Sequence, residues 1–327
     1  MNNKAKELSL KSKSGKNKYK KIPLYRQIWK YRLILLMLLP AFLYFIIFRY
    51  GPMIGLLIAF QDYTPRIGQS FMMAIINGKW VGLKHFIFFF TNISALNALR
   101  NTIVISLYKL FIGFPAPIIL AILLNEIKNL SFKKVVQTIS YLPHFMSWVV
   151  LAGILRVIFS PDYGAILPVF VKIGIPPINF LGDSRYFRAM LVISDIWQTV
   201  GWGSVIYLAA LSSLDIALYE SAKIDGASRL QQFWAITLPG IAPTIIIMFI
   251  LRIGLILNAG FDQIFNLQNS AVNNVGDIID TFVYRAGLLR AQYSYSTAIG
   301  LFKSLTGFVL VLVTNRVVKY FGHEGII

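Results

Sequence analysis

Four charged residues interrupt otherwise apolar stretches of the sequence: Lys109, Asp195, Arg252 and Lys303. A charge in the middle of a membrane costs about 2.5–3.5 kcal/mol on insertion scales, so it needs a charged partner or contact with water. Such groups therefore either pair with one another or line a wet path for a polar solute. Asp195 paired with Arg252 or Lys303 is the structural alternative, and the sequence leaves both interpretations open.

A second group of residues is spaced to form two short helices joined by a turn. Asp215 can cap the first helix by accepting a free backbone N–H, and Gly226 can adopt the left-handed conformation that ends it. Ser228 and Gln231 have the S-x-x-Q spacing of a capping box that opens a second helix. Pro239 marks where the chain turns into the next apolar segment. We expect a compact knob with Tyr219, Ala222 and Ala227 near its tip and Phe233, Trp234 and Ile236 packed behind. An ordinary amphipathic loop is the alternative.

Residue patterns for catalysis, metal binding or nucleotide binding are missing from the sequence. The chain has no cysteine, which excludes thiolate zinc sites and cysteine nucleophiles. Its histidines, His85, His144 and His323, lack the spacing of a metal motif. Residues 300–304 lack the G-x4-G-K-[ST] spacing of a phosphate-binding loop, so we do not expect this chain to bind ATP. We expect no catalytic residue, metal or cofactor in this chain, and His144 as a packed or solute-facing polar group.

The elements that position these residues must lie in a membrane. Of the 327 residues, 57% are hydrophobic and 14% are charged, whereas soluble domains carry roughly a quarter charged residues. The net charge of +19 would suggest nucleic acid binding in a soluble protein. Here eleven basic residues and one acid fall within residues 1–32, which indicates a membrane-surface tail and no nucleic-acid partner.

Six segments are long enough to cross a hydrocarbon core, which takes about 20 helical residues. They cover residues 33–50, 102–124, 135–159, 189–211, 241–260 and 296–318. Gly51 and Pro52 should bend or end the first segment. The connecting stretches 61–100, 160–187 and 261–295 contain aromatic residues, glycine and proline and can hold short surface helices. The predicted fold is an all-α membrane protein with six transmembrane helices.

The distribution of Lys and Arg predicts the orientation, because these residues concentrate on the cytoplasmic side. With the N-terminus inside, the cytoplasmic parts hold eighteen basic residues, among them Lys128, Lys133, Lys134 and Lys223. Both termini are then cytoplasmic. Residues 1–30 are expected to form a mobile cytoplasmic tail that lies along anionic lipids, and residues 31–327 the membrane domain. A signal peptide is the alternative, but the basic stretch is long and no small-residue cleavage site follows it.

The stretch 213–239 resembles the EAA signature of permease subunits in ABC importers that use a substrate-binding protein. The family pattern is E-A-A-x3-G-x9-I-x-L-P. The chain matches it at Glu220, Ala222, Gly226, Ile236, Leu238 and Pro239, with Ser221 in place of the first alanine. Over about residues 31–327 the chain is similar to the maltose-permease-like class. Asn101–Thr102, Leu142–His144, Asp225–Ala227 and residues 322–325 look most like its polysaccharide and complex-sugar branch.

This resemblance implies a transport subunit and not an enzyme. It implies a type I ABC importer permease fold in a bacterial plasma membrane, with the loop at 213–239 as the coupling helix that docks on a cytoplasmic ATPase. The implied ATPase-coupling residues are Glu220, Ser221, Ala222, Asp225, Gly226, Ala227, Ile236, Leu238 and Pro239. The implied partners are a second homologous permease, giving a heterodimer, two ATPase subunits that bind ATP and Mg, and an extracytoplasmic solute-binding protein.

A sugar path would need aromatic faces together with amide and carboxylate groups that meet hydroxyls. The candidates are Asp195, Trp197, Trp202, Arg252, Asn258, Asp262, Gln263, Asn266, Tyr293, Tyr295 and Lys303. Anchoring at the membrane interface is the alternative role for each Tyr and Trp. Three membrane cations against one acid would suit an acidic oligosaccharide.

We therefore interpret the chain as the membrane-spanning subunit of an ATP-driven oligosaccharide importer that works by alternating access. Two other interpretations remain. The first is an importer permease for an amino acid, phosphate or another non-sugar solute, because the loop signature is shared across substrates. The second is a membrane-embedded sensor or enzyme whose basic tail recruits a partner.

Overall fold

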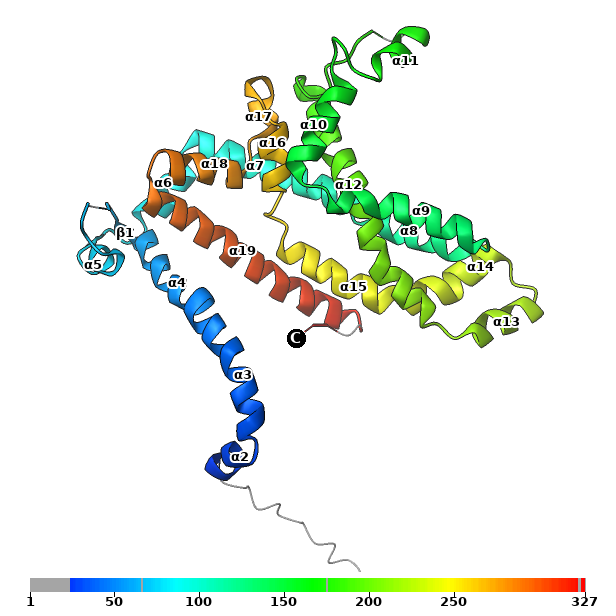
Figure 1. Ribbon diagram of the computed structural model, residues 1–327, viewed down its shortest axis with the longest axis horizontal. Coiled ribbons are helices and arrows are strands. Elements are labelled where there is room, and N and C mark those ends of the chain that lie inside the picture. The colour runs from blue at the N-terminus through cyan, green and yellow to red at the C-terminus, as the bar shows by residue number, and fades with distance from the viewer. Residues whose placement is uncertain (1–23, 66, 175, 323–324, 327) are drawn as a thin grey trace, which may run out of the picture. The chain divides into compact units, whose positions relative to one another are not determined.

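The computed structural model of the chain describes residues 24–65, 67–174, 176–322 and 325–326, which are mostly helical (Figure 1). The chain divides into two compact units, Met1–Gly55 and Leu56–Ile327. Of the tail predicted over residues 1–30, residues 1–23 lie outside the described part, and Leu24–Lys30 forms helix α2.

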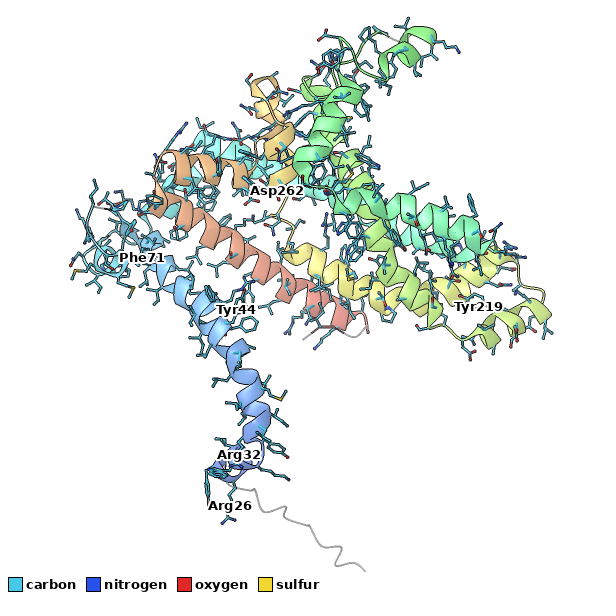
Figure 2. All side chains as sticks on the ribbon, in the orientation of Figure 1. Arg26, Arg32, Tyr44, Phe71, Tyr219 and Asp262 are labelled. Carbon is cyan, nitrogen blue, oxygen red and sulfur yellow. The ribbon has the colours of Figure 1, made fainter. Side chains whose placement is uncertain are left out.

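The first unit is a helical run in which α2 is followed by α3 (Arg32–Phe45), η1 (Ile46–Tyr50) and α4 (Gly51–Met53). The Arg32 guanidinium lies 4.6 Å from the centre of the Trp29 ring, a cation–π pair suited to a membrane interface. No described residue of α3, η1 or α4 is buried. Side chains such as Tyr44 project from the helix (Figure 2), so lipid or another protein must cover it.

The first span is longer than predicted, because Gly51 and Pro52 do not end it. The helix continues through η2 (Ile54–Phe60), so that the whole span covers Arg32–Phe60. The prediction that the helix ends near Tyr50 is therefore wrong.

Wide helical turns precede three of the prolines in the described spans. Three π-helical turns each end two residues before a proline: η1 before Pro52, η3 (Lys109–Gly113) before Pro115, and η5 (Phe233–Thr237) before Pro239. Proline lacks an N–H, and its ring clashes with the carbonyl four residues earlier. In η3 the Phe114 N–H reaches back five residues to the Lys109 carbonyl at 3.0 Å, so the turn widens and the helix continues.

Four further spans lie in the second unit, and five helices of the described chain are therefore long and apolar enough to cross a membrane. The four are Ile93–Glu126 (α7, Ile93–Tyr108; η3; α8, Pro115–Glu126), α12 (Ser184–Ser212), Arg229–Gly254 (α14, Arg229–Gln232; η5; α15, Leu238–Gly254) and α19 (Tyr293–Tyr320). They correspond to the second, fourth, fifth and sixth predicted spans, with bounds that differ by several residues. Membrane helices can be predicted in this way because each must satisfy its own backbone hydrogen bonds.

The third predicted span is broken, which corrects the expectation of a straight helix over residues 135–159. α9 (Leu130–Tyr141) and η4 (Leu142–Phe145) meet α10 (Trp148–Phe159) at 108°. The backbone is extended at Met146 and Ser147, and the Ser147 side chain caps α10 by accepting the Val150 N–H. The pair is one bent span or a re-entrant segment, which gives five or six spans in all.

Helix α12 organises the core of the second unit. It packs against α8, α9 and α15, and α15 packs in turn along α19 (Figure 1). One buried cluster joins α10, α12 and α16 (Phe261–Leu267) through Leu155, Leu191 and Ile264. A second joins Ala121, Tyr207 and Ile241 of α8, α12 and α15.

The connecting stretches carry short helices, as predicted. They are α5 (Phe71–Ile76), α6 (Lys84–Thr91), α11 (Leu167–Lys172), α16, η6 (Ser270–Val272), α17 (Asn273–Gly276), α18 (Ile279–Tyr284) and η7 (Arg285–Leu289). β1 (Gln61–Asp62) pairs antiparallel with β2 (Lys79–Trp80), with Gln61 opposite Trp80. A cluster of Phe89, Tyr295 and Ile299 fixes α6 against the start of α19.

Candidate functional site

The stretch 213–239 forms the two helices that the sequence predicts. Asp215 Oδ1 accepts the Ala217 N–H at 2.9 Å and so caps α13 (Ile216–Ile224). Gly226 has a φ of +77°, the left-handed conformation that glycine adopts without strain. The Ser228 N–H donates to Gln231 Oε1 at 2.7 Å and the Gln231 N–H to Ser228 Oγ at 3.4 Å, which is the predicted capping box.

Side-chain hydrogen bonds tie α13 to the helix that follows it. The Tyr219 hydroxyl lies 2.9 Å from Thr237 Oγ1, and Gln232 Nε2 donates to the Ala227 carbonyl at 2.8 Å. Thr237 and Gln232 are buried at these contacts. The middle of α13 and the turn that follows it are therefore held to the start of the fifth span.

The outer face of α13 has polar and apolar residues exposed together. Glu220, Ser221, Asp225 and Gly226 are exposed, as expected for a docking tip. Ile224 is 87% exposed and Ile216 71% exposed, and neither was among the predicted docking residues. Two isoleucines on a loop between polar residues were the signal in the sequence, because exposed apolar side chains favour a partner surface.

Two expectations about the knob are wrong. Pro239 does not turn the chain, because α14, η5 and α15 form one continuous helix over Arg229–Gly254. Trp234 is not packed behind the tip but is 61% exposed, and it lines an open groove with Leu230 and Ala235. Ile236 and Leu238 are half-buried, and Pro239 is exposed.

The fifth span ends earlier than predicted, at a polar cluster. α15 stops at Gly254, and residues 255–260 form turns and extended chain up to Gly260, whose φ is +101°. Lys109 Nζ donates to Asp195 Oδ1 and to the Ala259 carbonyl, both at 2.8 Å, and to Gln263 Oε1 at 2.5 Å. All three ammonium donors thus have partners, which stabilises a charge whose side chain is 4% exposed.

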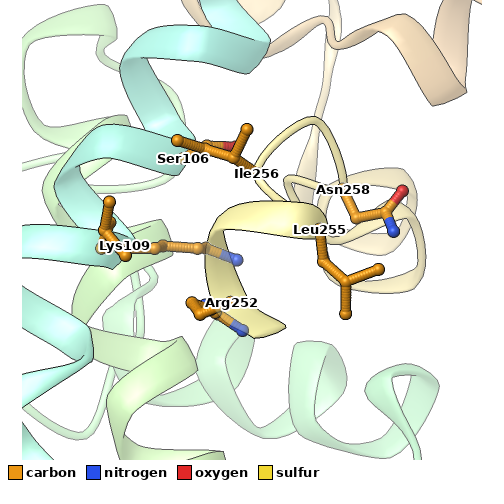
Figure 3. Close-up of a pocket in the computed structure, with 7 residues that line it drawn as sticks. Ser106, Lys109, Arg252, Leu255, Ile256 and Asn258 are labelled. Carbon is orange, nitrogen blue, oxygen red and sulfur yellow. The ribbon is translucent and has the colours of Figure 1, made fainter. Parts of the chain in front are cut away.

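Further bonds complete this cluster. Gln263 Nε2 donates to the Leu191 carbonyl at 2.7 Å and to Ser194 Oγ at 2.8 Å. Arg252 Nη2 lies 3.9 Å from Asp195 Oδ2, but the Arg252 side chain is 45% exposed. Figure 3 shows the side chains of Lys109 and Arg252 one above the other at the cavity next to this turn. Asp195 is therefore paired chiefly with Lys109. The Arg252 side chain is buried only in part, and its exposed part can contact another group.

Lys303 pairs with an acid that lies outside the predicted spans. Lys303 Nζ lies 2.5 Å from Asp280 Oδ1 of α18. The expected excess of three cations over one acid is thus reduced. The structural alternative offered Arg252 or Lys303 as the partner of Asp195; the structure shows the contact with Arg252, while Lys303 pairs with Asp280. Lys303 and Asn258 line one cavity of about 240 Å³ with Gly254, Leu255, Leu257, Ser304 and Gly307.

Comparison with known proteins identifies the chain's family. Residues 113–323 match the family described as binding-protein-dependent transport system inner membrane component. The chain belongs to this family. It is a transport permease, as the resemblance of its loop implies.

Relatives of this permease are similar over nearly its whole length. The polygalacturonan/rhamnogalacturonan transport system permease protein YteP of Bacillus subtilis (strain 168) is 46% identical over 314 residues, which are 96% of this chain and 95% of that protein. Protein LplB of the same strain is 44% identical over 303 residues, 93% of this chain and 92% of that protein. A chain in the crystal structure of a bacterial alginate ABC transporter, in complex with alginate pentasaccharide-bound periplasmic protein, has a TM-score of 0.85. It is 38% identical, and the match covers 93% of the permease and 100% of that chain. The permease is thus an all-α, multi-pass inner-membrane protein with the predicted fold.

The remaining predicted path residues of the permease lie in separate places. Trp202 is 51% exposed and stacks on His144, with ring centres 5.0 Å apart and planes at 3°. Trp197 lies further along α12 and is 38% exposed. Asp262 and Asn266 lie on α16, where Arg156 donates to the Asn266 carbonyl. Tyr293 and Tyr295 begin α19 beside Tyr63 and Phe88 and are not in the polar cluster.

The structure therefore brings together only part of the predicted path. Asp195, Arg252, Asn258 and Gln263 meet at the break after α15. Reasoning from the sequence missed two polar residues. Asp280 pairs with Lys303, and Ser106 lines the cavity with Lys109 and Arg252. Tertiary contacts alone bring both residues to these places.

Proposed function

We propose that this permease is the membrane-spanning subunit of an ATP-driven importer of acidic oligosaccharides. In this proposal an extracytoplasmic solute-binding protein delivers the sugar, and two ATPase subunits bind ATP and Mg. A second homologous permease completes the path across the membrane. The names of the relatives, for polygalacturonan, rhamnogalacturonan and alginate, support this substrate class.

The observation that carries the proposal is the coupling loop. α13 is capped at its start, closed by Gly226 at its end and tied to the fifth span by Tyr219 and Gln232. Its outer face exposes Ile224 among polar residues. A short, rigid and partly apolar knob of this kind fits a cleft on another protein, and we assign that protein as the ATPase.

The loop connects directly to the polar cluster. The continuous helix Arg229–Gly254 is about 39 Å long at 1.5 Å per residue. It starts beside α13 and ends at the break that contacts Lys109 and Asp195 through Ala259 and Arg252. A displacement of α13 by the ATPase would thus be passed as a rigid-body motion to the middle of the membrane. Only a difference in how the ATPase binds α13 in its two states can drive this motion.

Side chains with exposed polar or aromatic faces supply the proposed substrate contacts. Arg252 has a free side, and Asn258 lies exposed at the edge of the adjacent cavity. The stacked rings of Trp202 and His144 offer an aromatic face suited to a sugar ring. A guanidinium is also the group best suited to a uronate carboxylate.

The proposed orientation places α13 and both termini in the cytoplasm. The basic residues near the first span and in the loops after α8 and α12 favour this side, and Lys and Arg of the first unit can contact anionic lipids. α5, α6, α11 and α16 to α18 then lie on the extracytoplasmic side, where they can meet the solute-binding protein.

The test is a charge placed on the docking face. Ile224→Asp should abolish ATP-driven uptake of oligogalacturonides into proteoliposomes that contain the assembled transporter. Because Ile224 is 87% exposed, the permease should keep its melting temperature. A matched control is Ile67→Asp, at a fully exposed isoleucine before α5, which should transport as the wild type does.

Chemical crosslinking gives the second measurement. A single cysteine introduced as Ile224→Cys, joined to a photo-reactive crosslinker, should capture the ATPase in the assembled transporter. Normal uptake by Ile224→Asp, or a crosslink to no ATPase, would refute the coupling assignment.

A further inference from the structure

A pocket lies at the start of α19, away from the polar cluster. Residues of β1 and α6 line it together with residues 291–295, where α19 begins. It has a volume of about 630 Å³ and is lined by residues that include Asp62, Tyr63, Lys84, His85, Phe88 and Tyr293. Sites for small ligands in proteins have volumes of about 300–1,000 Å³. We propose that this pocket binds a sugar unit of the transported oligosaccharide, an inference that rests on the proposed function.

Aromatic rings form the walls of the pocket. The rings of Tyr63 and Tyr293 lie 6.2 Å apart at 79°, and those of Phe88 and Tyr295 lie 4.9 Å apart. The Tyr63 N–H donates to Ser294 Oγ at 2.9 Å and so fixes the β1 segment against α19. Aromatic faces of this kind cover the apolar face of a sugar ring while the phenol oxygens of Tyr63 and Tyr293 remain available for hydroxyls.

Charged groups form the polar edge of the pocket. Lys84 Nζ lies 2.8 Å and His85 Nε2 3.1 Å from the Asp62 carboxylate. The hydrogen bond from Lys84 lowers the pKa of Asp62, so this carboxyl is ionised at neutral pH. A carboxylate that accepts and an ammonium that donates, side by side, match two neighbouring sugar hydroxyls. Lys84 is 60% exposed and can also turn to a uronate carboxylate.

An irregularity of the backbone marks the edge of the pocket. Among the described residues, Ala291 alone has a positive φ without being glycine, at +53°. This strained backbone directs Gln292 and Tyr293 to the pocket, and strain of this kind gathers at binding sites. Tyr295 is 4% exposed and its hydroxyl is buried, so this residue contributes the face of its ring to the wall and makes no hydrogen bond to the sugar.

The pocket is distinct from the cavity beside Lys303. A Cβ on Gly307 of α19 would meet the Gly254 carbonyl, so Gly307 lies level with the end of α15. Tyr295 precedes Gly307 by twelve residues, or about 18 Å along the helix. A long oligosaccharide can therefore occupy the pocket and the mid-membrane path at once, whereas a short one cannot. In the proposed orientation the pocket lies on the extracytoplasmic side and holds the trailing end of the substrate.

The test compares two substrate lengths in the assembled transporter. Tyr293→Ala should raise the KM for uptake of hexagalacturonide about 10-fold and change the KM for digalacturonide less than 2-fold, with kcat retained for both. Tyr163→Ala is the matched control, because Tyr163 is 73% exposed in the loop before α11 and lines no part of the pocket. Lys84→Ala, at an exposed side chain, should give the same pattern if Tyr293→Ala does not fold.

The outcomes separate the inference from the proposed function. If wild-type transporter imports no oligogalacturonide, the proposed substrate fails. If it imports both lengths and the variants change neither KM, or raise both equally, the pocket is not a separate sugar site. Photo-reactive hexagalacturonide should label the peptide that contains Tyr293 in the wild type. Labelling confined to other peptides, or to the control peptide around Tyr163, would overturn the inference.

Discussion

Lys109 is the residue on which the mid-membrane cluster depends. Its ammonium joins Asp195 of α12, Ala259 of the irregular segment and Gln263 of α16. Removing one member of a buried ion pair leaves an uncompensated charge, which costs about 3–5 kcal/mol, whereas removing both costs less. The cluster therefore fixes where the fifth span is interrupted.

A double-mutant cycle tests this role. Lys109→Met and Asp195→Asn should each lower the free energy of unfolding of the solubilised permease by about 3–5 kcal/mol. The double variant should lose at least about 1 kcal/mol less than the sum, because the two residues are in contact. Denaturant titration followed by tryptophan fluorescence gives the free energies.

The control pair lies at the surface. Arg229 and Glu126 are 3.4 Å apart, with side chains 76% and 60% exposed. Exposed pairs contribute about 0–1 kcal/mol, so the cycle of Arg229→Gln and Glu126→Gln should show a coupling below about 0.5 kcal/mol. Equal couplings at the two pairs would mean that Lys109 and Asp195 do not act as a buried unit.

Close helix contacts determine how the elements pack. A Cβ on Gly201 of α12 would lie 2.0 Å from the carbonyl oxygen of Ser140 in α9. That oxygen belongs to the backbone, so it cannot move aside without shifting α9. Gly153 of α10, in contrast, has open space where a Cβ would lie.

The same chemical change at these two glycines should have opposite effects. Gly201→Ala should destabilise the permease by about 1–3 kcal/mol through overpacking. Gly153→Ala should stabilise α10 by up to about 1 kcal/mol, because alanine has the higher helix propensity. Melting of the purified protein, followed by its intrinsic tryptophan fluorescence, measures both. Equal melting temperatures would show that α12 and α9 do not approach as closely as described.

Orientation is a property of the whole molecule, and the proposal attributes it to all basic residues together. Deleting residues 1–20 removes seven lysines but leaves Lys21, Arg26, Lys30 and Arg32 beside the first span. We expect uptake within about two-fold of wild type and an unchanged orientation, because charges within about 15–20 residues of a span suffice.

Because the chain has no cysteine, its orientation in the membrane can be measured with a single introduced thiol. In a Ser221→Cys variant of the deletion, the new thiol is the chain's single cysteine and lies on the exposed tip of α13. A membrane-impermeant maleimide should label it from the cytoplasmic side only. Labelling from outside, or complete loss of uptake, would show that residues 1–20 do more than the remaining basic residues can replace.

The sequence was sufficient for features with local causes. Five spans and the helix caps of the loop at 213–239 could be predicted, because a membrane helix satisfies its own backbone and a cap involves residues three or fewer positions apart. The end of α9 before Pro143, the break at Met146 and Ser147, and the passage through Pro52 could not, since the same residue type ends one helix and leaves another continuous. Whether a wide turn forms before a proline depends on the neighbours that the helix packs against.

Only the tertiary structure decided which residues meet. The sequence suggested Arg252 or Lys303 as the partner of Asp195, whereas in the structure Lys109 bonds to Asp195, Ala259 and Gln263, which lie 86, 150 and 154 positions away from it. In the same way, Lys303 pairs with Asp280, and the Tyr293 ring lies beside the Tyr63 ring. The sequence shows which apolar segments contain a charge, and each such charge needs a partner when it is buried. Which partner it meets depends on how the helices pack, and local sequence patterns do not contain that information.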